Sequence, residues 1–264
     1  KANTQSSNIG IGWGALCVNT SGSANLSLGN FSLRNNTTGN FNLAIGNLSL
    51  DSNVSGVNNI AVGYQSLSNN TNGDNNNSIG CRAMCCNTTG TSNVVYGTNA
   101  LMNNTTGSSS VAIGVSSLTN ATTGYGNVGV GFTAGCTITS GSGNVMIGNC
   151  QQVSSVTGNR QLKIGTFDGA TCQTWLSGDS SSNLTAGGNI TLANDKKVIF
   201  GDAAENIVGD GSNLSINSSG YFAATVTGNI LLSSANNGFI AMRKSGVSYL
   251  EFSTVSLSSI TSIR

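Results

Sequence analysis

The chain has no histidine and no proline, and only 7% of its 264 residues are charged. Without histidine there is no Ser-His-Asp triad, no Cys-His pair and no imidazole ligand for a metal. A formal net charge of +1 supplies no basic field for nucleic acid. No apolar run approaches the roughly 18 residues that span a bilayer. The sequence therefore predicts neither nucleic-acid binding nor membrane insertion, and it excludes most familiar hydrolases.

The missing proline also has a structural meaning, because every rung of a stacked parallel β ladder needs its backbone N–H. Hydrophobic residues make up 38% of the chain, which is enough for a core, whereas Gly, Asn, Ser and Thr together exceed half of it. These residues are mostly poor helix formers, and no stretch places apolar residues at helical spacing over three turns. We therefore expect an all-β fold.

A single period organises the chain as far as Gly165, because a glycine recurs at every seventeenth position with no insertion or deletion. In each repeat this glycine follows a short apolar segment, as in GNFSLRNNTTGNFNLAI from Gly29 to Ile45. Ten residues further on, a second glycine such as Gly39 closes a Thr- or Ser-rich turn. Two glycine series with one spacing predict stacked coils of identical length. The first series consists of Gly12, Gly29, Gly46, Gly63, Gly80, Gly97, Gly114, Gly131, Gly148 and Gly165.

Each coil is expected to hold two short strands around a narrow core. Apolar residues alternate in the first strand, as at Leu43 and Ile45, which is the pattern of a strand with one buried face. A column of leucines such as Leu50 would line the opposite wall. The residue between each apolar pair is small, as Ala44 is, so we expect the strand's other face to pack closely, against another chain. Because one coil cannot bury its apolar side alone, we predict a parallel β-roll or solenoid.

Asparagine recurs where the chain leaves the second glycine turn. Stacked at this position, each side-chain amide can bond the amide of the next coil. We interpret the column as a structural ladder rather than a binding site. Its members are Asn25, Asn42, Asn59, Asn76, Asn93, Asn127 and Asn144.

Short segments within the repeats resemble those of known fibrous proteins. They are similar to the head repeats of trimeric autotransporter adhesins, and the longer unit containing NNTTG resembles tail-fibre and structural proteins of phages. The resemblance covers about residues 9–165 and implies a left-handed β-roll in which three chains pack around a common axis. The adhesin repeat is usually a little shorter than the unit found in this chain. The segments are NLAIG (Asn42 to Gly46), NIAVG (Asn59 to Gly63), SVAIG (Ser110 to Gly114) and NVMIG (Asn144 to Gly148).

After Gly165 the period is lost, and short alternating segments such as GNITLANDKKVIFGD follow between Gly, Asn and Asp turns. They resemble shaft segments of phage tail fibres, in which three chains intertwine. We predict a β-roll domain at 1–165, a transition segment at 166–182 and a β-rich fibre shaft at 183–264.

Residues that carry chemistry are sparse. The chain has seven cysteines, an odd number. Cys17, Cys85 and Cys136 share one repeat position but lie several coils apart, too far for a disulfide, and we expect the seven to be free, mostly packed thiols. Asp51 and Asp74 occupy different repeat positions, and we expect them in solvated turns rather than as a catalytic pair. The sequence predicts no enzymatic activity, no cofactor and no metal.

We expect a structural fibre segment of a virion that positions or takes part in host-surface attachment. Its partners would be two further copies of itself, other virion structural proteins and a host-surface glycan or protein. Free thiols fit assembly in the host cytoplasm better than secretion. The aromatic residues Trp13, Tyr64, Phe132 and Trp175 can stack on sugars or fill contacts between chains.

A carbohydrate-degrading spike is one alternative, but its hallmark, clustered carboxylates in a groove, is missing here. Two further alternatives stay open at this point. One is the head of a bacterial trimeric adhesin at the cell surface. The other is a monomeric surface- or ice-binding β-solenoid, suggested by the regular threonines Thr38, Thr89, Thr106 and Thr123.

Overall fold

The computed structural model describes residues 7–188, 190, 243–244 and 247–248, and the chain divides into two compact units, Lys1–Lys196 and Lys197–Arg264. In the second unit the described residues form one antiparallel pair, β13 (Arg243–Lys244) with β14 (Val247–Ser248). Most of the shaft predicted at 183–264 lies outside the described residues.

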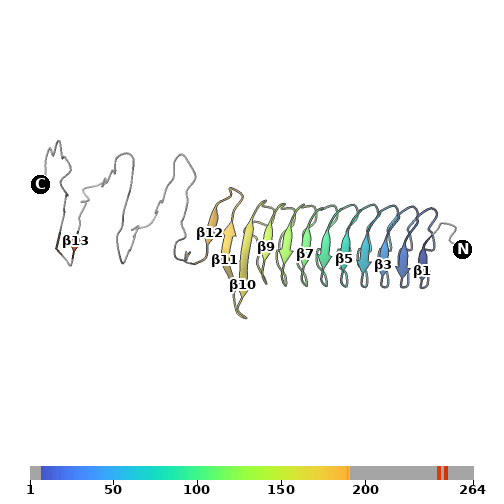
Figure 1. Cartoon of the computed structure of the whole chain (residues 1–264), viewed down its shortest axis with the longest axis horizontal. Helices are drawn as coiled ribbons and strands as arrows, with labels where there is room; N and C mark the ends of the chain where they lie inside the picture. Colours follow the sequence, from blue (N-terminus) through green and yellow to red (C-terminus); the bar gives the residue numbers. More distant parts are fainter. Residues whose placement is uncertain (1–6, 189, 191–242, 245–246, 249–264) are drawn as a thin grey trace. The chain divides into compact units, whose positions relative to one another are not determined.

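The first unit is a parallel β-solenoid whose coils lie side by side (Figure 1). Leu43 pairs with Ile60, Ala44 with Ala61 and Ile45 with Val62, so each strand residue pairs with its equivalent one full repeat further on. The described residues contain no helix. An all-β solenoid with the repeat length that the sequence indicates is thereby confirmed. Its parallel strands are β1 (Ile9–Ile11), β2 (Leu26–Leu28), β3 (Leu43–Ile45), β4 (Ile60–Val62), β5 (Asn77–Ile79), β6 (Val94–Tyr96), β7 (Val111–Ile113), β8 (Val128–Val130) and β9 (Val145–Ile147).

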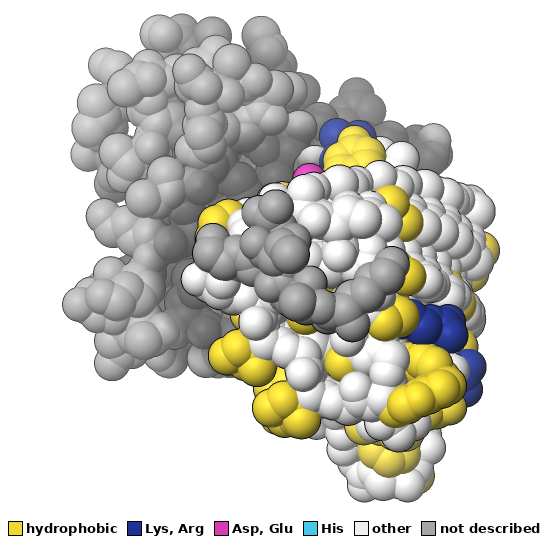
Figure 2. All heavy atoms as spheres, turned by 90° about the vertical axis from the view of Figure 1, so that its right-hand side faces the viewer, with side chains coloured by type: hydrophobic (Ala, Val, Ile, Leu, Met, Phe, Trp, Pro, Cys, Tyr) yellow, Lys and Arg dark blue, Asp and Glu magenta, His cyan; other side chains and the backbone are white. Residues whose placement is uncertain are grey.

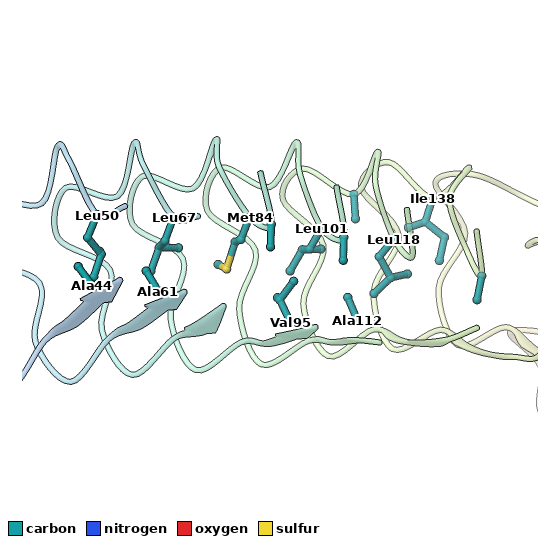
Figure 3. Packing of buried hydrophobic residues seen from close by; sticks show 14 of the residues in the cluster. Ala44, Leu50, Ala61, Leu67, Met84, Val95, Leu101, Ala112, Leu118 and Ile138 are labelled. Atoms are coloured by element: carbon teal, nitrogen blue, oxygen red, sulfur yellow. The ribbon is translucent and has the colours of Figure 1, made fainter. Parts of the chain in front are cut away.

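The core is built from the central residues of β2–β9, most of which are small, and from the leucine column. Ala44 and Ala61 are fully buried, and Leu50 and Leu67 point toward them from the opposite side of the coil (Figure 3). The larger apolar residues that flank each central residue face outward instead. The expected orientation of the strand was therefore wrong. In so narrow a coil the leucine fills the interior, which leaves room for only a small side chain on the strand.

The expected second strand is also absent from the described coils. Leu50 and Leu67 have φ angles of 48° and 52°, in the left-handed region, and the segment around them is a series of turns. Its backbone still bonds along the stack, because the Leu50 N–H donates to the Ser66 carbonyl of the next coil over 3.1 Å. Left-handed residues turn the chain back around the core within a few positions, which an extended strand cannot do.

The Asn column forms a buried ladder along the stack. The Oδ1 of Asn42 accepts hydrogen bonds from the backbone N–H of Asn59 at 3.0 Å and from its Nδ2 at 3.2 Å. That Nδ2 also donates to the Gly73 carbonyl over 2.8 Å. The next rung repeats the pattern, with Asn76 donating to the Oδ1 of Asn59. Each amide therefore satisfies backbone groups as well as its neighbour in the ladder.

A second Asn ladder runs beside the first, and sequence reasoning missed it. The Nδ2 of Asn53 donates to the Oδ1 of Asn36 at 2.8 Å and to the Gly56 carbonyl at 3.0 Å. The signal was present in the repeated N-T-T-G turn, whose asparagine recurs with the same spacing as the glycine. Its buried members are Asn36, Asn53, Asn70, Asn87 and Asn104.

An antiparallel hairpin covers the end of the stack. Strand β10 (Leu162–Phe167) pairs with β9 in parallel and with β11 (Cys172–Gly178) in antiparallel fashion, and β12 (Leu184–Ala186) pairs with β11. The buried Gln151 donates to the Gln173 carbonyl over 3.2 Å and accepts from the Thr174 hydroxyl over 3.2 Å.

A disulfide joins Cys150, in the segment that follows β9, to Cys172 at the start of β11, with Cα atoms 6.1 Å apart. The expectation of free thiols was thus wrong for this pair. The hairpin folds back on the last coil, so Cys172 reaches a position that repeat spacing does not predict.

Replacing Gly63 with alanine tests the first glycine column. Gly63 has φ +129°, and an added Cβ would lie 2.5 Å from the Gly80 carbonyl oxygen. We expect G63A to lower the free energy of unfolding by about 3 kcal/mol, measured by urea denaturation at fixed protein concentration.

The matched control is Gly126→Ala, where φ is +64° and no atom lies within 4 Å of the added Cβ. Asn58 and Ser92 hold similar φ angles at the same repeat position, at 57° and 60°. G126A should therefore cost about 1 kcal/mol. Equal losses in the two variants would contradict this account of the column.

Substitutions at Asn59 test the first ladder. Asn59→Ala leaves the buried N–H of Asn76 without its acceptor, so we expect a loss of about 3 kcal/mol in unfolding free energy. Asn59→Ser should cost clearly less, because Ser110 occupies this column naturally and its Oγ accepts the N–H of Asn127 over 3.2 Å. Identical urea midpoints for the two variants would show that the acceptor is not what matters.

Candidate functional site

The outward side chains of β1–β9 form a continuous apolar stripe, which we define as the first and third residues of these strands. Nine strands about 4.8 Å apart give it a length of roughly 38 Å. Tyr96 is 60% exposed, whereas residues in the middle of the stripe such as Leu43 and Ile60 are half-buried. Asn77 is the single polar member. The others are Ile9, Ile11, Leu26, Leu28, Leu43, Ile45, Ile60, Val62, Ile79, Val94, Tyr96, Val111, Ile113, Val128, Val130, Val145 and Ile147.

Such a stripe is unusual on the surface of a lone soluble chain, where large contiguous apolar patches mark contact sites. The alternation of the strand explains how it arises. Because the central residue must fit beneath the leucine, both of its neighbours point away from the core. The stripe is thus a surface set by the fold, with the geometry to bind another apolar surface.

Exposed aromatic residues lie next to the stripe. Trp13, Tyr64 and Phe132 each follow the glycine that ends a strand segment, and Trp13 is 72% exposed. The ring centroid of Trp13 lies 4.6 Å from that of Phe31, edge to face, and the guanidinium of Arg34 lies 4.8 Å from the Phe31 centroid. Hydrophobic groups also gather on the lower part of the end view in Figure 2. These rings are available for contacts with chains or with sugars.

Trp175, in β11, is exposed as well. The four aromatics singled out in the sequence are therefore all at the surface. The structure does not bring them into one site.

Asp51 does not lie in a solvated turn, so that expectation was wrong. It is only 9% exposed, and its Oδ2 accepts a hydrogen bond from the Nη2 of Arg34 over 2.8 Å. Burial raises the pKa of Asp51, and the neighbouring Arg34 opposes that shift. Arg34 reaches Asp51 because the two residues occupy the same repeat position in adjacent coils. Their spacing of one repeat is visible in the sequence, but sequence reasoning did not use it. Asp74 accepts the Val57 N–H over 2.8 Å.

No group of three or more His, Cys, Asp or Glu side chains that could hold a metal ion exists among the described residues. Among the free cysteines of the described residues, Cys85 and Cys86 are neighbours whose sulfur atoms lie 3.6 Å apart. Burial raises the pKa of Cys85 to about 11, with a further contribution from Cys86, and Arg82 opposes the shift. Cys85 is therefore a protonated core thiol at neutral pH. In the part of the chain that the structure describes, no helix is long and apolar enough to cross a membrane.

No protein-family model, curated protein or solved structure matches this chain.

Cysteine alkylation tests whether Cys17 and Cys85, which share one repeat position, differ in accessibility as the structure shows. Cys17 is exposed, whereas Cys85 is buried, and with a pKa of about 11 roughly one Cys85 thiol in a thousand is ionised at pH 8. We expect iodoacetamide at pH 8 to modify Cys17 at least about ten times faster than Cys85, measured by peptide mass spectrometry. Comparable rates would show that the core opens on the timescale of labelling.

Proposed function

We propose that the chain is a segment of a homotrimeric virion fibre, such as a tail fibre, that positions or takes part in host-surface attachment. The observation that carries the proposal is the apolar stripe along β1–β9. Three copies packed around a common axis would shield their stripes from water. The resemblance of the repeats to trimeric fibrous proteins supports three copies rather than two.

The stripe favours association of solenoids over an isolated rod. At about 25 cal/mol per Å² of apolar surface removed from water, a stripe of this length supplies a large driving force for association. The adjacent rings of Tyr64 and Phe132 extend the apolar surface beyond the strand. Trimerisation would then be coupled to stability, and separated chains would tend to aggregate.

An extended rod suits a mechanical role. Each coil adds about 4.8 Å of length and needs only its neighbours for support. Three identical chains on a fibre, and several fibres on a particle, turn weak contacts into firm attachment by raising the effective concentration. Other virion structural proteins and a host-surface glycan or protein are the partners of this proposal. The Cys150–Cys172 disulfide fits a protein that works outside the reducing cytoplasm, whatever its place of assembly.

The ice- or surface-binding alternative is less favoured. The exposed threonine column, which includes Thr89 and Thr106, is interrupted by Asn72. In the neighbouring column the hydroxyl of Thr88 donates to the Thr105 carbonyl over 3.0 Å, so it is already engaged by the next coil. A single broken column does not make the regular array that an ordered surface requires.

Charge substitutions within one coil test the proposal. Ile113 belongs to the stripe, and Thr106 lies in the exposed turn of the same coil. We expect the unaltered chain to sediment at three times the mass of a single chain. Ile113→Lys should dissociate or aggregate it, because a trimer would bury three unpaired charges.

Thr106→Lys is the control and should leave the mass unchanged. A stable, well-folded monomer of the unaltered chain, or an Ile113→Lys variant with an intact trimer, would contradict the proposal.

A further inference from the structure

A groove lies at the end of the solenoid, between the last coils and the turn that joins β11 to β12. Its volume is about 630 Å³, within the range of small-ligand sites. None of its residues belongs to the apolar stripe. The lining residues are Tyr125, Ser142, Gly143, Asn159, Arg160 and Ser180.

Two late coils lack a side chain at one repeat position, and one of the two glycines, Gly143, lines the groove. Gly126 and Gly143 stand where earlier coils carry Asn58, Asn75 and Ser92. The φ angles of the two glycines are +64° and +66°, close to the 57°, 58° and 60° of the other three. The backbone therefore does not require glycine here. What glycine provides is room, and an added Cβ on Gly143 would lie 3.6 Å from the Cγ of Arg160.

Tyr125 supplies an aromatic face to the groove. It is 67% exposed, and the two residues stacked after it at the same repeat position, Ser142 and Asn159, are polar. The Tyr125 N–H donates to the Ser142 Oγ over 3.1 Å, and the Ser142 N–H donates to the Asn159 Oδ1 over 2.7 Å. These bonds fix the two polar side chains along the stack. The hydroxyl hydrogen of Ser142 and the Nδ2 of Asn159 donate to no described residue, so they are free to bond a ligand.

Arg160 supplies the charge. It is exposed and forms no ion pair with any described carboxylate, since the pair between Arg34 and Asp51 is the only one in the described residues. Asp179 lines an adjoining hollow. Its oxygens are taken by the N–H groups of Ser181 and Asn183 and by the Asn183 amide, and these hydrogen bonds lower the pKa of Asp179. The carboxylate is thus held by its own turn.

We propose that this groove binds an acidic saccharide, a sugar ring that carries a carboxylate. The apolar C–H face of the ring packs on Tyr125, and its hydroxyls bond the Asn159 amide and the serine hydroxyls. The carboxylate pairs with the guanidinium of Arg160, which matches its planar geometry. This inference rests on the proposed function in that the sugar would belong to the host surface.

The probes are the methyl glycosides of glucuronic acid, N-acetylneuraminic acid and glucose, titrated into the full chain by calorimetry. Methyl glucuronide and methyl glucoside differ only in a carboxylate against a hydroxymethyl group. We expect at least one acidic glycoside to bind at least about tenfold more tightly than the glucoside, with an affinity that falls as salt rises. Binding of neither acidic glycoside, or binding of the glucoside as tight as that of both acidic glycosides, overturns the proposal.

Two variants locate the site. Arg160→Gln should remove at least tenfold of the acidic preference, and Gly143→Asn should abolish binding by filling the groove. Asn is tolerated at this backbone position, as Asn58 and Asn75 show. The matched control is Ser92→Asn, which makes the corresponding change three coils earlier and should bind as the unaltered chain does. Circular dichroism confirms that each variant is folded, and unchanged binding in both Arg160→Gln and Gly143→Asn overturns the assignment.

Sedimentation of the same samples separates this inference from the proposed fibre. A trimer that binds no acidic glycoside would overturn the groove assignment and leave the fibre proposal standing. A monomer that binds an acidic glycoside at Arg160 would overturn the fibre proposal and leave the groove assignment standing.

Discussion

The structure depends on hydrogen bonding along the stack between coils of constant length. The Gly56 carbonyl shows how closely these hydrogen bonds are connected. It accepts hydrogen bonds from the side-chain amides of both Asn42, at 2.8 Å, and Asn53, at 3.0 Å. A Cβ on Gly56 would lie 2.5 Å from the Asn53 Oδ1 and from the Gly73 carbonyl. The two Asn ladders and the second glycine column therefore form one hydrogen-bonded unit. A coil that gained or lost a residue would break its bonds to both neighbours, which explains why the repeat keeps one length throughout this region.

The same constraint produces the surface proposed for function. A coil this narrow holds one large side chain in cross-section, and Leu67 takes that place opposite Ala61. The apolar residues Ile60 and Val62 then have only the outside of the strand to occupy. An apolar exterior on one flat face is a consequence of core geometry, and it makes association with further chains the simplest way to remove that face from water.

Much of this architecture could be predicted from the sequence, because a fixed period reports which residues stack. The period predicted the parallel register and the ladder at Asn42 and Asn59, but it could not predict which face of the strand is buried. The alternating pattern of Leu43 and Ile45 is the same whether these side chains face the core or the surface. Only the volume left beside Leu50 decides which of the two orientations the strand takes. The Cys150–Cys172 disulfide and the groove at Arg160 were unpredictable for a different reason. Cys172, and Ser180 at the edge of the groove, lie in the hairpin after the last coil, where repeat spacing carries no information.

Departures from the repeat collect in the last coils, and their packing shows that they compensate one another. Gly135 replaces the core leucine, while Ile138 replaces a ladder asparagine and Met146 a small strand residue. A Cβ on Gly135 would lie 2.7 Å from the Leu118 side chain, 3.1 Å from that of Met146 and 3.2 Å from that of Ile138, so these side chains already fill the space of the missing leucine. Figure 3 places Ile138 beyond Leu118 at this end of the core. Core volume is thus conserved while its sources change. That freedom lets the final coils exchange ladder and turn residues for other surface groups. In these coils the structure changes from a regular repeat to the end of the solenoid, which carries its own groove.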